Sequence, residues 1–443
     1  MSGFTTLQLH GGDAPADAHA ARATPLYLTA GFVFDDADHA GERFAGGDGG
    51  LTYTRYGNPT VEAVERRIAA LEGGGGALLL GSGQAALAIA LLGLAGAGDR
   101  VLSAASIYEG TRGLLLENLP RLGIEADFVE DAGDLAAWEA AIRPGTRAVF
   151  VESIPNPKND LVDLDAIAGL AHRHGLPVVV DNTLATPYLY RPVEHGADVV
   201  VHSASKFLAG HGTVLGGVIV DAGRFDWEPE RFPQLFAPTR VGGPSPAERH
   251  GALAFIGHLR DDVAPRFGPT ASPFNAFLIQ QGVETLSLRV ARSNENAIAI
   301  ARHLESRPEV HSVDHAGLAS SPYHAIARRD FPRGAGSVFS FTLRGGRPAA
   351  RAFIDAVSLF TRMTHLGDVR SLILHPASTT HTQRSDDELR RAGIWPGLIR
   401  LSVGIEDLPD LLDDLERGFT AVAALERAAP PASARPELTA TEP

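Results

Sequence analysis

The sequence contains no cysteine among its 443 residues. That absence excludes disulfide bonds, thiolate nucleophiles, and zinc or iron–sulfur centres held by cysteine. Positive charge is also scarce, because 39 lysines and arginines face 53 aspartates and glutamates, which gives a net charge of −14. No run of basic residues occurs, so a general nucleic-acid binder is disfavoured.

Long hydrophobic runs are missing as well. The uncharged stretch Ala77–Gly98 is split by a Gly-Ser-Gly-Gln break into a short apolar run and a helix of roughly 14 residues, which suits a buried core helix better than a bilayer crossing. The N-terminal residues 1–12 have neither the basic nor the apolar part of a secretory signal. We therefore expect a soluble, cytoplasmic protein with no membrane span.

The length is about three times the usual ~150-residue domain and predicts more than one folding unit. Residues 1–60 are rich in Gly, Pro, Asp and Thr without a sustained period, which indicates an extended arm and not a packed unit. We expect a large domain at 61–265, a C-terminal domain at 266–427 and a disordered, Pro- and Ala-rich tail at 428–443. Within these, the Pro- and Gly-punctuated residues 221–273 indicate an insertion or a domain junction.

Short apolar strands alternate with helices through the first of these domains. We expect strands at 77–80, 100–103, 148–151, 177–180 and 198–201, and helices at 62–71, 84–94 and 164–174. Further on we expect a long helix at 283–304, strands at 336–343 and 398–403, and a closing helix at 408–425. The pattern predicts an α/β fold with a mostly parallel sheet covered on both faces, followed by a second, smaller α/β region.

The most informative passage runs from Asp198 to Gly212, where a buried strand is followed by Ser203, Ser205 and Lys206. Lys206 is one of very few lysines in an arginine-rich chain, and taken alone it is as consistent with an ordinary surface lysine. A second buried strand ends at Asp181. Ligand sites in open α/β sheets usually lie at the carboxyl ends of the strands.

A third feature is the Gly81-Ser82-Gly83-Gln84 turn between an expected strand and an expected helix. The free N–H groups and positive end of such a helix favour an anion, although turns of this kind are also common connectors. Together, Lys206, Asp181 and this turn supply what pyridoxal phosphate requires: an amine for the Schiff base, an acid for the pyridine nitrogen and a phosphate cradle with hydroxyl donors.

On these residues the chain resembles the Cys/Met-metabolism family of pyridoxal-phosphate enzymes, over essentially everything except the tail. The resemblance implies the aspartate-aminotransferase-like fold, also called fold type I. The lysine passage matches the family's cofactor-lysine signature with one departure, since Ser205 stands where threonine is usual. Serine keeps the hydroxyl that would contact the phosphate.

The resemblance also implies the remaining cofactor contacts. Tyr53 and Arg55 would hold the phosphate in a neighbouring subunit's site, which implies a homo-oligomer, a tetramer with a dimer as the minimum. Without the resemblance, their segment indicates a solvated loop. Tyr108 would stack on the cofactor ring, and Asn156 would face its phenolic oxygen. The expected cofactor contacts are Lys206, Gly83, Gln84, Tyr108, Asn156, Asp181, Ser203, Ser205, Tyr53 and Arg55, and the expected catalytic residues are Lys206, Tyr108 and Asp181.

For the substrate, the resemblance implies that Arg400 grips an α-carboxylate as a bidentate pair. Ser371 and Thr380 fall in family segments near the substrate. Two histidines in the same region, His375 and His381, show no partner set at ligand spacing in the sequence. We expect structural roles for them and no metal.

Local choices resemble the O-acetylhomoserine sulfhydrylase branch, among them Gln84 and a glycine, Gly110, where methionine γ-lyases carry cysteine. His365 stands where related lyases carry serine, which leaves the acetyl or succinyl preference open. The implied reaction is γ-replacement on O-acetylhomoserine with sulfide, or methanethiol, giving homocysteine or methionine and acetate. The alternatives are a methionine γ-lyase, a cystathionine γ-synthase-type enzyme and, more remotely, a non-catalytic carrier of the cofactor. A carrier has no need of the carboxylate clamp at Arg400.

Overall fold

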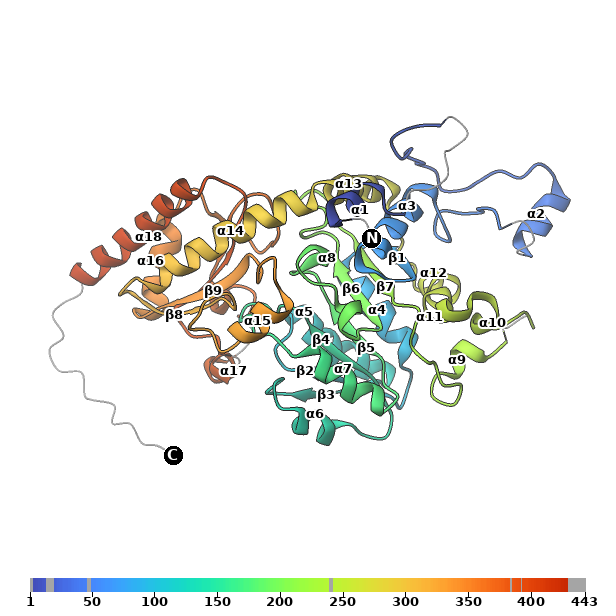
Figure 1. Ribbon diagram of the computed structural model, residues 1–443, viewed down its shortest axis with the longest axis horizontal. Helices are drawn as coiled ribbons and strands as arrows, with labels where there is room; N and C mark the ends of the chain where they lie inside the picture. Colours follow the sequence, from blue (N-terminus) through green and yellow to red (C-terminus); the bar gives the residue numbers. More distant parts are fainter. Residues whose placement is uncertain are drawn as a thin grey trace.

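The computed structural model describes residues 3–12, 20–45, 49–238, 242–382, 385–391 and 393–428. The expected tail lies outside the described residues from 429 onward. Two sheets form, each with its own hydrophobic core, and Figure 1 shows the smaller one to the left of the larger. This confirms the predicted α/β class. Among the described helices, none has the length and apolar character that crossing a membrane requires.

The large sheet has, within the described residues, the strand order β1-β7-β6-β5-β4-β2-β3. The strands are β1 Gly76–Leu80, β2 Arg100–Ala104, β3 Glu125–Val129, β4 Thr146–Glu152, β5 Val178–Asp181, β6 Val199–Ser203 and β7 Gly217–Asp221. Strands β3, β2, β4, β5 and β6 run parallel, whereas β7 is antiparallel to β6 and β1. Parallel strands end at one side of a sheet, so Glu152, Asp181 and Ser203 lie together there. We call this the site edge.

Helices of the large domain begin where the sequence supplies caps. The side chain of Asn58 accepts the N–H of Thr60 at the start of α3 (Pro59–Glu72), and Ser82 accepts the N–H of Ala85 at the start of α4 (Gly83–Leu94). Leu80 of β1 and Ser203 of β6 both pair with the first residue of β7, so α4 begins at the site edge. The other helices here are α5 Glu109–Gly113, α6 Leu135–Ala141, α7 Leu164–Arg173 and α8 Thr186–Leu189.

The second sheet has the order β10-β11-β12-β9-β8 within the described residues. Its strands are β8 Val310–Asp314, β9 Val338–Leu343, β10 Thr361–Arg362, β11 Leu372–Leu374 and β12 Leu398–Ser402. Its core includes Phe353, which meets Phe341 and Phe419 edge-on at ring-centroid distances of 5.5 and 5.0 Å. The helices of this part are α15 His324–Asp330, α16 Gly346–Ala356, α17 Asp386–Arg391 and α18 Leu408–Ala428.

The expected helix at 283–304 is interrupted. α13 (Pro273–Glu284) and α14 (Leu286–Glu305) are separated by a turn at Thr285, which caps the end of α13. Val290 of α14 belongs to the core of the large sheet, whereas Ala297 belongs to the core of the small one. The two cores therefore divide within α14, which spans both domains in Figure 1, and not at residue 266.

Arg289 ties α14 to the turn that follows β6. Its buried guanidinium donates to the carbonyl of Phe207 at 2.9 Å and to that of Gly282 at 2.5 Å. Burial lowers the pKa of Arg289 to about 10. The turn that carries Lys206 is thus fastened to the helix that joins the two cores.

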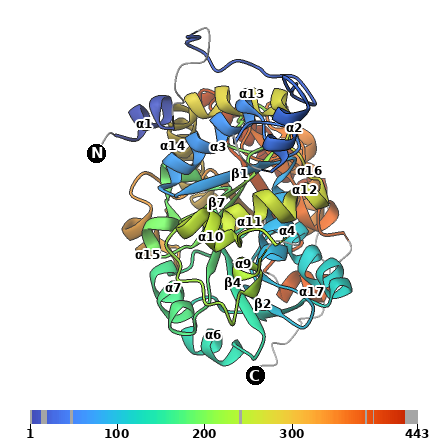
Figure 2. The same ribbon diagram turned by 90° about the vertical axis from the view of Figure 1, so that its right-hand side faces the viewer.

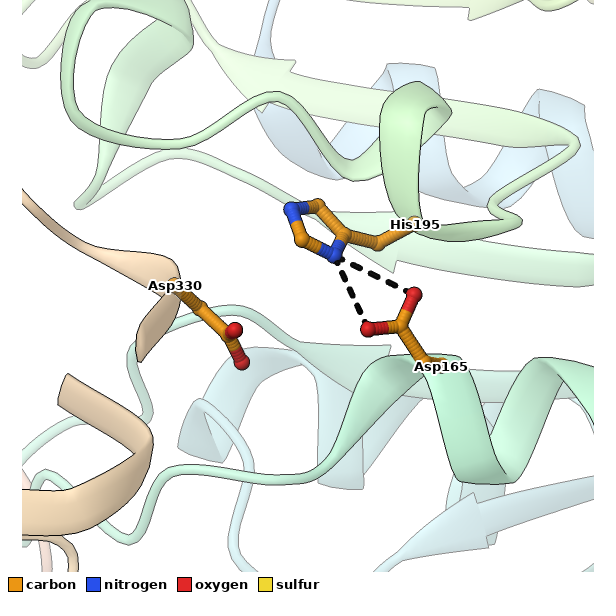
Figure 3. A group of neighbouring side chains, drawn as sticks. All are labelled: Asp165, His195 and Asp330. Atoms are coloured by element: carbon orange, nitrogen blue, oxygen red, sulfur yellow. Dashed lines mark hydrogen bonds and ion pairs between the residues drawn. The ribbon is translucent and has the colours of Figure 1, made fainter. Parts of the chain in front are cut away.

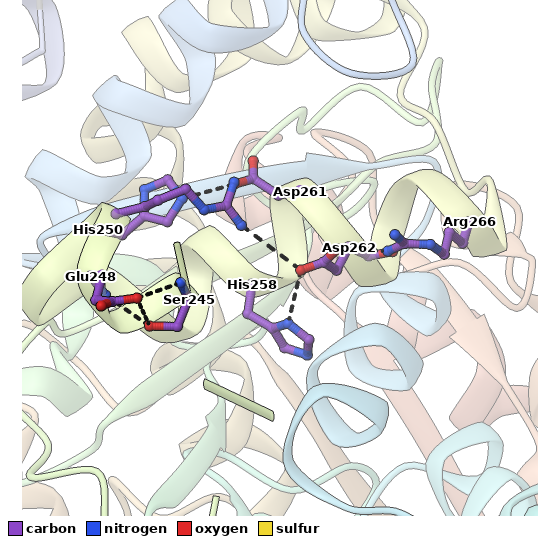
Figure 4. Close-up of polar contacts among 8 residues, drawn as sticks. Ser245, Glu248, His250, His258, Asp261, Asp262 and Arg266 are labelled. Atoms are coloured by element: carbon purple, nitrogen blue, oxygen red, sulfur yellow. Dashed lines mark hydrogen bonds and ion pairs between the residues drawn. The ribbon is translucent and has the colours of Figure 1, made fainter. Parts of the chain in front are cut away.

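The expected insertion forms the short helices α9 Pro233–Phe236, α10 Pro246–His250, α11 Ala254–His258 and α12 Ala264–Phe267, and the helical turn Leu259–Val263 between α11 and α12 contacts α4. Figure 4 shows polar contacts within residues 245–266, where Arg266 donates to the carboxylate of Asp262 at 2.8 Å. Partly exposed pairs of this kind contribute only about 0–1 kcal/mol each. The fully buried Phe255 and Leu259 supply the packing, since both would touch a Cβ placed on Gly93 of α4.

Residues 1–60 are extended only in part. α1 (Phe4–His10) packs on α3, α13 and α14, with Phe4 and Gln8 buried. Beyond it, the described residues 20–45 and 49–58 project from the body on the side of α3, as Figures 1 and 2 show. This projection carries α2 (Ala37–Phe44), in which no residue is buried.

Candidate functional site

Lys206 lies at the site edge, in the turn after β6. The chain has two lysines, and the other, Lys158, pairs with Asp314 at 2.9 Å. Among the described residues no carboxylate pairs with Lys206, whose Nζ lies 3.1 Å from Nδ1 of His365. Burial and the positive charge of Arg400 together lower the pKa of Lys206 to about 8. The neutral amine, the form that attacks a carbonyl, is therefore far more available near neutral pH than it is for an ordinary lysine.

Asp181 is the last residue of β5 and is held by Thr183. The backbone N–H and the hydroxyl of Thr183 donate to the same carboxylate oxygen at 2.9 and 2.5 Å, and the hydroxyl accepts the N–H of Ser203 at 2.8 Å. Burial raises the pKa of Asp181, and the two donors of Thr183 oppose that rise. Sequence reasoning missed Thr183, although an Asp-x-Thr turn is a local signal for such a contact.

Glu152 is a second acid at the site edge that sequence reasoning missed. It pairs in register with Asp181, and its carboxyl group accepts the N–H of Tyr108 at 2.6 Å. Burial raises the pKa of Glu152 well above its usual value, and the charge of Asp181 raises it further. Glu152 therefore holds a proton more readily than an ordinary glutamate. The signal was available, because Glu152 follows a buried strand just as Asp181 does.

A wholly buried polar cluster, made of Glu72, Asn182 and His202, adjoins Asp181. Glu72 contacts Nε2 of His202 at 2.7 Å and accepts the side-chain N–H of Asn182 at 2.8 Å. Positive charge on His202 lowers the pKa of Asp181. The cluster therefore favours the ionised form of Asp181, which can hold a proton donor such as a pyridinium nitrogen.

The expected phosphate cradle would lie at the start of α4. A Cβ placed on Gly83 would lie 2.6 Å from Cβ of Ser203, so only glycine allows α4 to approach the end of β6 this closely. The free N–H groups of the first helical turn and the Ser203 side chain consequently lie together. Ser205 is buried, and its hydroxyl donates to the carbonyl of Gly216 at 3.2 Å and accepts that residue's N–H at 3.0 Å. Its contact with a phosphate remains a prediction.

Tyr108, Gln84 and Gly110 form one contact group. The side chain of Gln84 donates to the carbonyl of Gly110 at 2.9 Å. A Cβ on Gly110 would lie 2.5 Å from Cε1 of Tyr108 and 3.2 Å from Oε1 of Gln84. The Tyr108 side chain is 49% exposed, which leaves ring surface on which a cofactor ring can stack.

Arg400 comes from β12 of the small domain and lies near Lys206. Its guanidinium is 5% exposed and donates to the side-chain oxygen of Asn156 at 3.4 Å and to the carbonyl of Thr364 at 3.1 Å. Burial lowers the pKa of Arg400 to about 10, and no carboxylate pairs with it in the part of the chain that is described. A buried cation without an anion is costly, so this group is ready to receive a carboxylate.

A cavity of about 750 Å³ opens beside Asn156, and Ile107, Lys158 and His381 are among its lining residues. Its volume is in the usual range for small-molecule sites. Thr380 lies next to it, with its hydroxyl 2.9 Å from Nδ1 of His381. A role for Thr380 in binding substrate remains a prediction.

Ser371 bonds to other residues of the small domain and does not face a binding site. It is fully buried, its hydroxyl donates to Glu406 at 2.9 Å, and the same oxygen accepts the N–H of Gly404 at 2.9 Å. Those bonds leave no free donor for a ligand and fasten β11 to the loop after β12. The geometry therefore does not support the expected substrate contact of Ser371.

Tyr53 and Arg55 are not brought to Lys206 within one chain. Both are exposed, and Arg55 donates to the carbonyl of Pro265 at 2.5 Å while its guanidinium lies 4.8 Å from the ring centre of Tyr56. No described contact joins Tyr53 or Arg55 to the residues of the site edge. This arrangement is compatible with the expected role in a neighbouring subunit.

The histidines give no support to a metal at the site edge. Nδ1 of His375 lies 2.7 Å from the Ser378 hydroxyl, and Nε2 lies 2.8 Å from the carbonyl of Pro396, which is a structural role. Within the described residues, one set at ligand spacing does occur elsewhere, and Figure 3 shows its members, Asp165, His195 and Asp330. Arg329 already binds both oxygens of Asp330, at 2.6 and 2.8 Å. The sequence did not reveal this set because its members lie far apart along the chain.

The residues at the site edge fit pyridoxal phosphate. An amine of lowered pKa at Lys206, an oriented acid at Asp181 and an anion-binding helix start at Gly83 match the aldehyde, the ring nitrogen and the phosphate of that group. The sequence analysis identified all three. It missed Thr183, Glu152 and the buried support at His202.

Comparison with known proteins agrees with this geometry. The family model described as "Cys/Met metabolism PLP-dependent enzyme" matches residues 5–420. The chain is 46% identical to "O-acetyl-L-homoserine sulfhydrylase" of Corynebacterium glutamicum, over 95% of this chain and 97% of that protein. It is 42% identical to "Homocysteine/cysteine synthase" of Saccharomyces cerevisiae, over 96% and 99%.

A solved structure is similar as well. It is the crystal structure of a "putative O-acetylhomoserine (thiol)-lyase" from Campylobacter jejuni, which carries an N'-pyridoxyl-lysine-5'-monophosphate. Its TM-score is 0.90 at 35% sequence identity, over 94% of this chain and 99% of that chain.

Proposed function

The chain belongs to the Cys/Met-metabolism PLP-dependent enzymes, and we propose that it is a transferase acting on O-acetyl-L-homoserine. Sulfide replaces the acetate at the γ-carbon and gives L-homocysteine, a step of methionine and amino-acid biosynthesis. The observation that carries this proposal is the near-full-length similarity to O-acetyl-L-homoserine sulfhydrylase, at 46% identity. Methanethiol in place of sulfide would give L-methionine.

Bound pyridoxal phosphate supplies an electron sink for the carbon atoms of the amino acid. Lys206 would move protons, because Nζ can take the α-proton and then act as base and acid at the β-carbon, removing a proton there before acetate leaves and returning one after sulfide has added. Asp181 holds the proton at the pyridine nitrogen, and Tyr108 supports the ring. Arg400 binds the α-carboxylate through parallel N–H groups and so fixes which substrate bond faces Nζ.

We also propose that each site is completed by a second copy of the chain, in a cytoplasmic homotetramer with a dimer as the minimum. The support is the projecting arm, residues 20–45 and 49–57, in which Leu28 is 71% and Val33 92% exposed. Exposed apolar side chains of this density favour a protein partner. Arg55 and Tyr53 of one copy would then hold the phosphate in the site of the other.

Hybrid oligomers test the shared site. Arg55→Ala and Lys206→Ala chains are each expected to be inactive, and mixing them after subunit exchange should restore part of the activity. Recovery follows because one site per hybrid dimer regains both side chains. No recovery in demonstrably mixed oligomers would place Arg55 in its own subunit.

A product assay tests the reaction. We expect homocysteine as the major product from O-acetylhomoserine at saturating sulfide, with less 2-oxobutanoate and ammonia. Succinylhomoserine and methanethiol run in parallel define the acyl and sulfur preferences, and Lys206→Ala is the inactive control. If the keto acid remains the major product at saturating sulfide, the protein is a γ-lyase.

A further inference from the structure

His365 is held against Lys206 by the loop between β10 and β11. Its Nδ1 lies 3.1 Å from Nζ of Lys206. The loop is fixed, because the next-but-one residue, Gly367, has φ +71° and its N–H donates to the hydroxyl of Ser402 at 3.0 Å. The N–H of Val369 donates to the carbonyl of Gly210 at 2.9 Å. The imidazole is therefore placed beside the amine by a loop whose backbone N–H groups bond to both domains, to Ser402 in the small one and to Gly210 in the large one.

His365 enters this contact as the neutral imidazole. Burial and the nearby positive charge of Lys206 together lower the pKa of His365 to about 4. Of the other charged groups that face the ring, Asp368 raises this pKa, whereas Arg370 and Arg400 lower it. His365 is thus unprotonated over the whole working range of pH.

The direction of the hydrogen bond follows from the second ring nitrogen. Nε2 of His365 is buried and has no hydrogen-bond partner in the described structure. The Lys206 amine always has a hydrogen to donate, and Nδ1 accepts it when the ring proton is on Nε2. An acceptor beside Nζ favours the ammonium form over the amine, since a hydrogen bond from a charged donor is about twice as strong as one from a neutral donor.

We propose that His365 is a positioning residue for Lys206, in which Nδ1 accepts a hydrogen bond from Nζ whenever the amine is free and holds it at the substrate. The inference rests on the proposed function, because it concerns the step in which Lys206 moves the α-proton. His365 does not itself take that proton. It limits where Nζ can be when the proton is transferred, and it stabilises the protonated amine that results.

The full-length chain with its cofactor removed gives a readout that needs no turnover. Trace acetylation at a series of pH values, followed by peptide mass spectrometry, yields the pH midpoint of Lys206 reactivity, with Lys158 as the internal reference. We expect His365→Leu to lower that midpoint by about half a unit to one unit, and His365→Asn, which keeps an acceptor, to restore most of it. His211→Leu is the matched control, since Nδ1 of His211 contacts the carbonyl of Ala209 instead.

Steady-state kinetics of homocysteine formation supply the second readout. His365→Leu should lower kcat about tenfold with KM unchanged, and His365→Asn should recover it. An unchanged labelling midpoint in His365→Leu overturns the contact, whatever the activity. A shifted midpoint with unchanged kcat overturns the role in proton transfer. If the wild-type chain makes no homocysteine, the proposed function fails, and the labelling result still decides the contact.

Discussion

Replacing Lys206 with methionine should make the cofactor-free protein more stable at neutral pH. The pKa of Lys206 falls from the ordinary 10.5 to about 8 on burial. Each unit corresponds to about 1.4 kcal/mol, so holding the charged amine in the folded protein costs about 3 kcal/mol below pH 8. Methionine has a similar unbranched shape but loses the hydrogen bond to His365, worth about 1 kcal/mol. The expected net gain at pH 7 is about 2 kcal/mol.

The sign of this effect should reverse with pH. Because the folded pKa is the lower one, the unfolded chain binds more protons between pH 8 and 10.5, and wild-type stability rises with pH across that window. Above pH 10.5 only the lost hydrogen bond remains, so Lys206→Met should be about 1 kcal/mol less stable than wild type.

Thermal unfolding of the two cofactor-free proteins at several pH values measures the difference. About 2 kcal/mol corresponds to a shift of roughly 4–8 °C in Tm for a domain of about 200 residues, the size of the large domain. Lys158→Met is the control and should lower Tm, because it removes the partner of the largely buried Asp314. A pH-independent difference in stability between Lys206→Met and wild type would refute the reasoning, since it would mean that burial of the charged Lys206 amine does not destabilise the folded protein.

Three further outcomes follow from the geometry. Gly110→Cys should weaken cofactor binding about tenfold, measured by titrating the cofactor-free protein with pyridoxal phosphate, because its Cβ would displace the Tyr108 ring; an unchanged Kd would contradict this. Glu152→Gln should keep near-wild-type activity at pH 7, since burial favours the neutral form of that carboxyl and glutamine can still accept the Tyr108 N–H; a loss of more than tenfold would contradict this. Asp414→Asn should destabilise the small domain by about 1–3 kcal/mol. Burial favours a higher pKa for Asp414, but the N–H groups of Ser358, Phe360 and Leu359 hold it below the usual value, so the wild-type advantage should persist above about pH 4 and fade in acid, as followed by circular dichroism.

The sequence predicted those parts of the fold in which burial and periodicity agree. The Val-rich strands β5 and β6 and the capped helix α4 are regular in both respects, and their positions were confirmed to within a residue or two. The edge strand β3 was not predicted because most of its residues, Glu125–Val129, are partly exposed and lack a continuous apolar run. The break between α13 and α14 at Thr285 was not predicted because the apolar periodicity continues through it.

At the site, residues that act alone at a strand end were predictable, and residues that act through a distant partner were not. Lys206 and Asp181 each carry a local signal. The contact of His365 with Lys206 joins positions 159 residues apart, and that of Glu72 with His202 joins positions 130 apart. The loss of a free hydroxyl at Ser371 depends on Glu406, which the strand pairing of the small domain brings to it.

The clamp made by Arg289 has a consequence for how the site can open. Arg289 fixes the turn after β6 to the first turns of α14, and the rest of α14 is embedded in the small-domain core. Arg400 and His365 come from that same small domain, whereas Asp181 and Gly83 belong to the large one. A hinge within α14 would therefore separate the groups that hold the substrate from those that hold the cofactor, while Lys206 stays with its turn. Opening and closing would thus break and remake the contact of the amine with His365, while the bonds of Arg289 keep the turn that carries Lys206 in place.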